Sequence, residues 1–151
     1  MPTLAIAEQT TSIPGYTFDQ APDLSSEAVR QKLTPNAIRL FTNIVRKWAL
    51  NEEQARSLLG GIASSTYHGW RTNPKNKKLD QDTLMRISLI IGIYKGLHLY
   101  FGDTVADRWI TSRNRGYLFA GRTPLEFMIR AGQPGMADVR RLIDSWRGGR
   151  V

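Results

Sequence analysis

The stretch that decides the fold is Leu50-Asn-Glu-Glu-Gln-Ala-Arg-Ser-Leu-Leu-Gly-Gly-Ile-Ala-Ser-Ser-Thr-Tyr-His-Gly-Trp70. Asn51 is placed to cap a helix, and Gln54 is placed to reach back to it, which is a variant of the capping box. Ala55 is small enough for two helices to approach closely, and the pair Gly60-Gly61 supplies a turn with positive φ. The stretch therefore predicts two short helices joined by a tight glycine turn.

Helical spacing of apolar residues continues on both sides of this stretch. Upstream, Thr34-Pro35 predicts the start of a helix, with threonine as the cap and proline at the first helical position. Downstream, Asp80 is expected to cap a long apolar helix that runs to about Tyr100 and forms the buried centre, and Asp103 begins another helix. Since no strand signal longer than a few residues follows Ser25, the sequence predicts an all-α fold.

Two further helices are predicted near the carboxyl end. Thr123-Pro-Leu-Glu126 is a capping box with proline at the first helical position. Gly132 and Pro134-Gly135 are expected to separate this helix from the last one. The last helix is expected to end at Gly148-Gly149 and to leave Arg150-Val151 as a small basic tail.

The charge of the chain is uneven. Its 151 residues carry a net charge of +8, of which residues 1–30 contribute −3, residues 31–100 contribute +7 and residues 101–151 contribute +4. An apolar content of 41% is sufficient for a core of one domain or two small ones. The basic excess favours nucleic-acid binding over a merely solubilising surface.

Several classes of protein are disfavoured. The chain has no cysteine, which excludes disulfides and cysteine metal sites. Residues 1–24 lack the pattern of a signal peptide and are expected to be a flexible segment, and the apolar run Ile87–Tyr94 is too short to span a bilayer, so we expect a cytoplasmic protein without membrane contact. His68 and His98 stand 30 positions apart, and no Walker loop, dinucleotide fingerprint or nucleophile elbow is present, so we expect neither an enzyme nor a cofactor.

The segment Leu50–Trp70 resembles the helix-turn-helix of phage-repressor-like (Xre-type) regulators. In such a motif the first residues of the second helix reach base edges in the major groove, and the following basic residues contact phosphates. Ile62, Tyr67 and Trp70 are expected to anchor this helix. The alternative is a purely structural helix pair. The candidate DNA-contacting residues are Ser64, Ser65, Thr66, Tyr67, His68, Arg71, Lys75, Lys77 and Lys78.

A second resemblance covers most of residues 100–150. It rests on the run Trp109…Asn114…Leu118-Phe119-x-Gly121-Arg122-x-Pro124-Leu125…Met128…Gly132…Val139-Arg140…Leu142…Asp144…Arg147-Gly148-Gly149. This run resembles the toxin-binding domain of the Xre/MbcA/ParS antitoxin family, and most closely the members encoded beside RES-domain toxins. Ala120 stands where a second glycine is common in the family.

The resemblance implies a type II antitoxin. Its partner would be a RES-fold toxin that consumes NAD, and the segment from Trp146 to Val151 would occlude the active-site cleft of that toxin. The pair would repress its own operon as a dimer or larger assembly. The candidate toxin-binding residues are Phe119, Arg122, Arg140, Trp146, Arg147, Gly148, Gly149, Arg150 and Val151.

Some of these assignments have alternatives. Trp146 could be a core residue and the tail a frayed end, and Arg140 could be a contact or part of a solvated face, whereas Phe119 and Arg122 are expected to be exposed in a loop. The expected organisation is a flexible segment (1–24), an Xre-like domain (25–101) and a toxin-binding domain with its tail (102–151). The alternative functions are a stand-alone regulator whose last domain serves dimerisation, and a basic adaptor that binds another protein.

Overall fold

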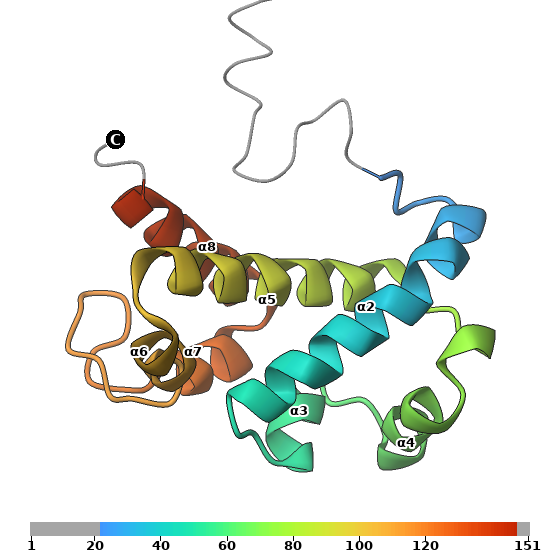
Figure 1. Cartoon of the computed structure of the whole chain (residues 1–151), viewed down its shortest axis with the longest axis horizontal. Coiled ribbons are helices and arrows are strands. Elements are labelled where there is room, and N and C mark those ends of the chain that lie inside the picture. The colour runs from blue at the N-terminus through green and yellow to red at the C-terminus, as the bar shows by residue number, and fades with distance from the viewer. Residues whose placement is uncertain (1–21, 148–151) are drawn as a thin grey trace, which may run out of the picture.

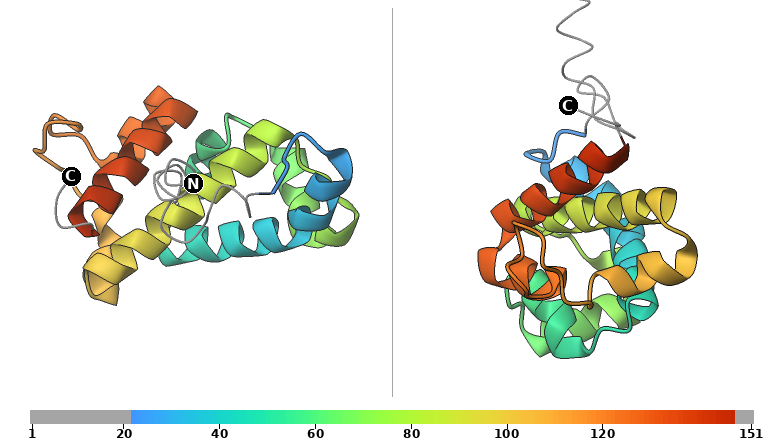
Figure 2. Two further views of the ribbon diagram at one scale, coloured as in Figure 1. Left: turned by 90° about the horizontal axis from the view of Figure 1, so that it is seen from above. Right: turned by 90° about the vertical axis from the view of Figure 1, so that its left-hand side faces the viewer.

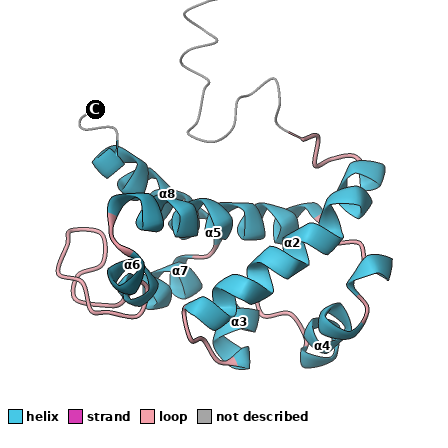
Figure 3. Ribbon diagram, viewed as in Figure 1, coloured by secondary structure: helices cyan, strands magenta, loops and turns pink. Residues whose placement is uncertain are grey.

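The computed structural model describes residues 22–147, and within this part every regular element is a helix (Figures 1 and 3). The all-α prediction is therefore confirmed. The helices are α2 (Glu27–Lys47), α3 (Glu52–Leu58), α4 (Ser64–Thr72), the 3-10 turn η2 (Pro74–Asn76), α5 (Gln81–Tyr100), α6 (Asp103–Trp109), α7 (Pro124–Ala131) and α8 (Gln133–Arg147).

Helix α5 forms the centre of the fold, as predicted. The Asp80 carboxylate caps it by accepting the Thr83 N–H at 2.7 Å. Ile87, Ile90 and Ile93 are at most 1% exposed. Helix α5 packs most extensively against α8 and α2, and the view from above shows it between these two helices (Figure 2). Because α5 is apolar on most sides, it can be covered from both flanks.

Helix α2 begins about two turns earlier than predicted. It starts at Glu27, with Ser26 as its cap, and continues through Pro35. The prediction of a helix start at Thr34-Pro35 is wrong, because the Thr34 hydroxyl does not cap a helix and instead forms two other hydrogen bonds. It donates to the Arg30 carbonyl at 2.7 Å and accepts the Leu79 N–H at 3.0 Å, which ties α2 to the segment before α5.

The separation of α7 from α8 is also shorter than predicted. Gly132 alone lies between the two helices, with φ of 72°. Pro134 and Gly135 belong to the first turn of α8, where proline is tolerated since that N–H has no helical partner. A Cβ at Gly135 would lie 2.5 Å from the Ala131 Cβ, so the tight corner requires glycine there.

Candidate DNA-binding and toxin-binding surfaces

The predicted pair of short helices is confirmed in α3 and α4. Asn51 and Gln54 form the full capping box, with hydrogen bonds of 2.8 and 2.9 Å. Ala55 is completely buried, and Gly60 and Gly61 both have positive φ, at 86° and 81°. The turn therefore depends on glycine for its backbone conformation.

The candidate DNA-contacting residues differ in exposure. Tyr67 is buried with its ring 6.0 Å from that of Trp70, as expected of an anchor of the helix, and this burial speaks against a direct DNA contact. Ser64 and Lys77 are half-buried. The remaining candidates are exposed on α4 or in the segment after it: Ser65, Thr66, His68, Arg71, Lys75 and Lys78.

Glu52 connects the two helices and was missed by sequence reasoning. Its carboxylate accepts the Ser64 hydroxyl at 2.8 Å and lies 2.9 Å from His68 Nε2. The Ser64 hydrogen bond, aided by the charges of His68 and Arg56, holds the pKa of Glu52 below its ordinary value despite some desolvation. Glu52 therefore stays ionised and fixes the first turn of α4 relative to α3.

Two of the loop lysines have side chains that contact other residues of the chain. Lys78 pairs with Glu27 at the start of α2. The Lys77 side chain passes over Gly69, where a Cβ would lie 3.3 Å from Lys77 Nζ. No ion pair of Lys75 with a described residue is found. Lys75 is thus better placed than its neighbours to receive an outside anion.

An aromatic cluster gathers around Trp146 near the end of α8. The Trp146 ring lies 5.2 Å from Tyr100, 5.9 Å from Phe101 and 5.5 Å from Trp109, measured between ring centroids. Trp146 is half-buried in this cluster. It is therefore part of the packed domain and still presents a partly exposed edge.

The expected exposure of Phe119 is wrong, because its side chain is 2% exposed. Backbone hydrogen bonds from Asn114 N–H to the Arg122 carbonyl (3.0 Å) and from Gly121 N–H to the Asn114 carbonyl (2.8 Å) close the loop. Ala120 and Gly121 have φ of 51° and 88°, and this closed loop buries Phe119 against Trp109 and Phe127. Arg122 is exposed, as expected.

Arg140 does not belong to a solvated face. Its side chain is 17% exposed and pairs with Asp144 at 3.2 Å. A Cβ at Gly92 would lie 1.7 Å from Arg140 Nη1, so this guanidinium occupies the space over Gly92 between α5 and α8. Arg140 therefore joins two helices, and this burial speaks against a direct toxin contact.

The proposed tail continues from the end of α8. Arg147 is the last residue of that helix. The side chain of Arg147 and the predictions for Gly148, Gly149, Arg150 and Val151 lie outside the described residues.

Apolar side chains are exposed at the same end of the molecule. The large apolar residues that are exposed in the described part are Leu99 (69%), Tyr100 (51%), Val105 (51%) and Tyr117 (fully exposed). We call Leu99, Tyr100 and Val105 the apolar surface. Leu99 and Tyr100 are the last residues of α5, whose end lies near that of α8, and Val105 lies in α6, which follows below (Figure 1). Exposed apolar side chains that form one continuous patch are typical of an interaction site, and these three residues are the candidates for such a patch in the described part of the chain.

His98 connects two helices near this end of the molecule. Its Nδ1 lies 2.9 Å from Asp103 and its Nε2 lies 2.8 Å from Asp107, which joins α5 to α6. Among residues 22–147, no group of three or more histidine, aspartate or glutamate side chains is arranged to hold a metal ion. No described helix has the length and apolarity needed to cross a membrane.

Comparison with known proteins identifies one domain near the carboxyl end of the chain. Residues 97–149, which contain the apolar surface and α6 to α8, match the antitoxin Xre/MbcA/ParS C-terminal toxin-binding domain. This domain indicates an antitoxin of a toxin–antitoxin system with a cognate toxin as partner, and such domains are not normally enzymatic.

A relative covers nearly the whole chain. The sequence is 31% identical over 126 residues to the uncharacterized protein y4oB of Sinorhizobium fredii (strain NBRC 101917 / NGR234), which covers 83% of this chain and 92% of the relative. The chain therefore belongs to the same family as this relative. Residues 97–149 of the chain form its antitoxin domain. No solved structure is significantly similar to the chain.

Proposed function

We propose that the chain neutralises a RES-type toxin that degrades NAD, by placing the segment Trp146–Val151 in the active-site cleft of the toxin. The observation that carries this proposal is the position of the exposed apolar residues. They lie within the matched toxin-binding domain, and the ring of one of them, Tyr100, lies 5.2 Å from that of Trp146, from which the tail continues. A partner that covers the apolar surface would therefore hold the tail at its own surface.

The charge around this region supports the same partner. The exposed cationic residues in this half of the chain include Arg108, Arg113, Arg115 and Arg122, and Lys95 is exposed one turn before Leu99 on α5. Arginine forms planar, bidentate contacts with carboxylates and stacks on aromatic rings. A toxin surface with an apolar centre and an acidic rim fits this arrangement.

Deletion of residues 148–151 is expected to abolish neutralisation without unfolding the protein. The cut must lie after Arg147, because Ile143 is completely buried and Trp146 packs against three aromatic rings. Growth is measured while the toxin and either form of the chain are co-expressed. A chain that lacks residues 1–21 is the control and is expected to protect. Equal protection by the chain that lacks 148–151 would remove the tail from the mechanism.

We further propose that the chain represses its own operon through α4, as a cytoplasmic dimer or larger assembly. The proposed functional units are residues 25–101 for DNA and 102–151 for the toxin, and Leu99 and Tyr100 at the end of α5 add to the toxin surface. Support comes from the exposure of Ser65, Thr66 and Arg71 on α4 and from the basic excess of this half of the chain.

Substitution of α4 residues is expected to separate base recognition from phosphate contact. Thr66→Ala with His68→Ala should change the sequence preference, because the first turns of the helix face base edges. Arg71→Ala with Lys75→Ala should weaken binding about equally on all sequences. Gel shifts with the upstream fragment and with an unrelated duplex give both quantities. Wild-type affinity in both variants would contradict the assignment of α4.

A further inference from the structure

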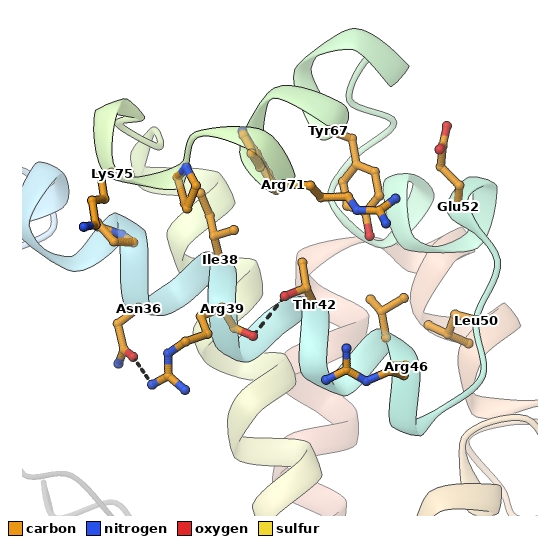
Figure 4. A pocket seen from close by; sticks show the side chains of 14 residues that line it. Asn36, Ile38, Arg39, Thr42, Arg46, Leu50, Glu52, Tyr67, Arg71 and Lys75 are labelled. Carbon is orange, nitrogen blue, oxygen red and sulfur yellow. Dashed lines mark hydrogen bonds between the residues drawn. The ribbon is translucent and has the colours of Figure 1, made fainter.

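An open groove with a volume of about 870 Å³ separates α2 from α4 (Figure 4). Arg39 and Arg46 line it from α2, and Arg71 and Lys75 line it from the opposite wall. Its floor is apolar and includes Ile38, Val45, Leu50, Tyr67 and Trp70. A groove with cationic walls and an apolar floor is suited to a ligand that has both anionic and apolar parts.

None of the four cations forms an ion pair with a described carboxylate, although the charge of Arg71 acts on Glu52 and helps to lower its pKa. Arg39 donates to the side-chain oxygen of Asn36, and Arg46 donates to that of Asn43, and both of these partners are neutral amides. No ion pair of Arg71 or Lys75 with a described residue is found.

The one carboxylate that lines the groove is already engaged. Glu52 accepts the Ser64 hydroxyl and lies against His68. An anion that enters the groove would therefore meet four cationic groups and a single, partnered carboxylate.

We propose that this groove binds a stretch of DNA sugar–phosphate backbone, with Arg39 and Arg46 of α2 contacting phosphates beyond those reached from α4. The inference rests on the proposed DNA binding by α4 and adds phosphate contacts from α2 to it. Phosphates alternate with deoxyribose along the strand, so the cations of the walls meet the phosphates while the apolar floor meets sugar carbons. A backbone strand also runs beside any helix that enters the major groove.

The sequence of α2 agrees with a role toward a polyanion. Arg39 and Arg46 are seven residues apart, so they fall on one face of the helix two turns apart. Between Glu27 and Lys47, α2 has five cationic residues and one acid, and that acid, Glu27, pairs with Lys78 instead of with either arginine.

The test compares Arg39→Ala with Arg46→Ala in one full-length protein against wild type. Binding of the fluorescent upstream fragment and of an unrelated duplex is measured by anisotropy across a salt series. Loss of two phosphate contacts should reduce the slope of log affinity against log salt by about 1.8 and weaken binding of both duplexes about tenfold. Arg39→Lys with Arg46→Lys should restore most of the slope, since lysine keeps the charge.

The matched control is Arg130→Ala with Arg141→Ala, which removes two exposed arginines from the other half of the chain. It should keep the wild-type slope. An unchanged slope for the Arg39 and Arg46 variant, while Arg71→Ala with Lys75→Ala loses affinity, would overturn the inference and leave DNA binding by α4 standing. If wild type binds neither duplex at low salt, the proposed DNA binding fails as well. If the α2 variant binds DNA normally and instead loses the toxin, the groove serves an acidic protein segment.

Discussion

Replacing Leu99 and Val105 with glutamine is expected to weaken capture of the toxin by at least about thirtyfold. The two side chains are 69% and 51% exposed, so nothing in the folded chain depends on their burial. In the complex they would be covered, and loss of apolar contact at the centre of an interface costs about 2 kcal/mol or more. Immobilised toxin and purified variants give the dissociation constants.

The variant must be distinguished from one that is merely unfolded. Ser88→Gln changes another exposed position of α5 and should bind the toxin like wild type. Thermal unfolding of both proteins should shift little. Unimpaired toxin capture by the Leu99 and Val105 variant would refute the role of the apolar surface. If the variant still captures the toxin but no longer self-associates in sedimentation experiments, the surface serves dimerisation, which is the role expected in a stand-alone regulator.

Phe119→Ala is expected to lower the free energy of unfolding by about 3–5 kcal/mol. The Phe119 ring is 2% exposed and packs edge-to-face on Trp109 and Phe127, at 5.6 Å in both cases. The truncation leaves a cavity beneath the loop that the left-handed Ala120 and Gly121 close. Urea unfolding followed by tryptophan fluorescence measures the loss.

Arg122→Ala provides the comparison for this loop. Arg122 is exposed, so its loss should change stability by no more than about 0.5 kcal/mol. A Phe119→Ala protein as stable as wild type, but unable to bind the toxin, would restore Phe119 as a contact residue and would contradict its structural role.

The elements that local chemistry determines could be predicted from the sequence. Asn51, Asp80 and Thr123 each have a side-chain oxygen that caps a helix, and each does so in the structure. Gly60 and Gly61 could be placed in a turn since only glycine adopts positive φ freely. The long apolar pattern before Tyr100 likewise required a buried helix.

Features that depend on distant partners could not be predicted. Thr34-Pro35 has the local pattern of a helix start, but the Leu79 N–H, 45 residues away, takes the threonine oxygen. The contact of Glu52 with Ser64 and His68 joins two helices across a turn and leaves no periodic signal.

Exposure was the least predictable property of the candidate sites. Leu99 and Tyr100 end a helix whose apolar residues are mostly buried, so hydropathy alone assigns them to the core, whereas the fold leaves that helix end uncovered. Phe119 shows the reverse case, because a loop position with glycine nearby was expected to face solvent. Both outcomes depend on which neighbouring elements pack against a residue, and spacing along the chain does not contain that information.

Co-expression with the product of the neighbouring gene, which we propose to be a RES-type toxin, tests the central claim most directly. The full-length chain is predicted to restore growth during toxin induction and to co-purify with the toxin as a stable complex. Growth arrest that is equal with and without the chain, together with no recovered complex, would contradict the account.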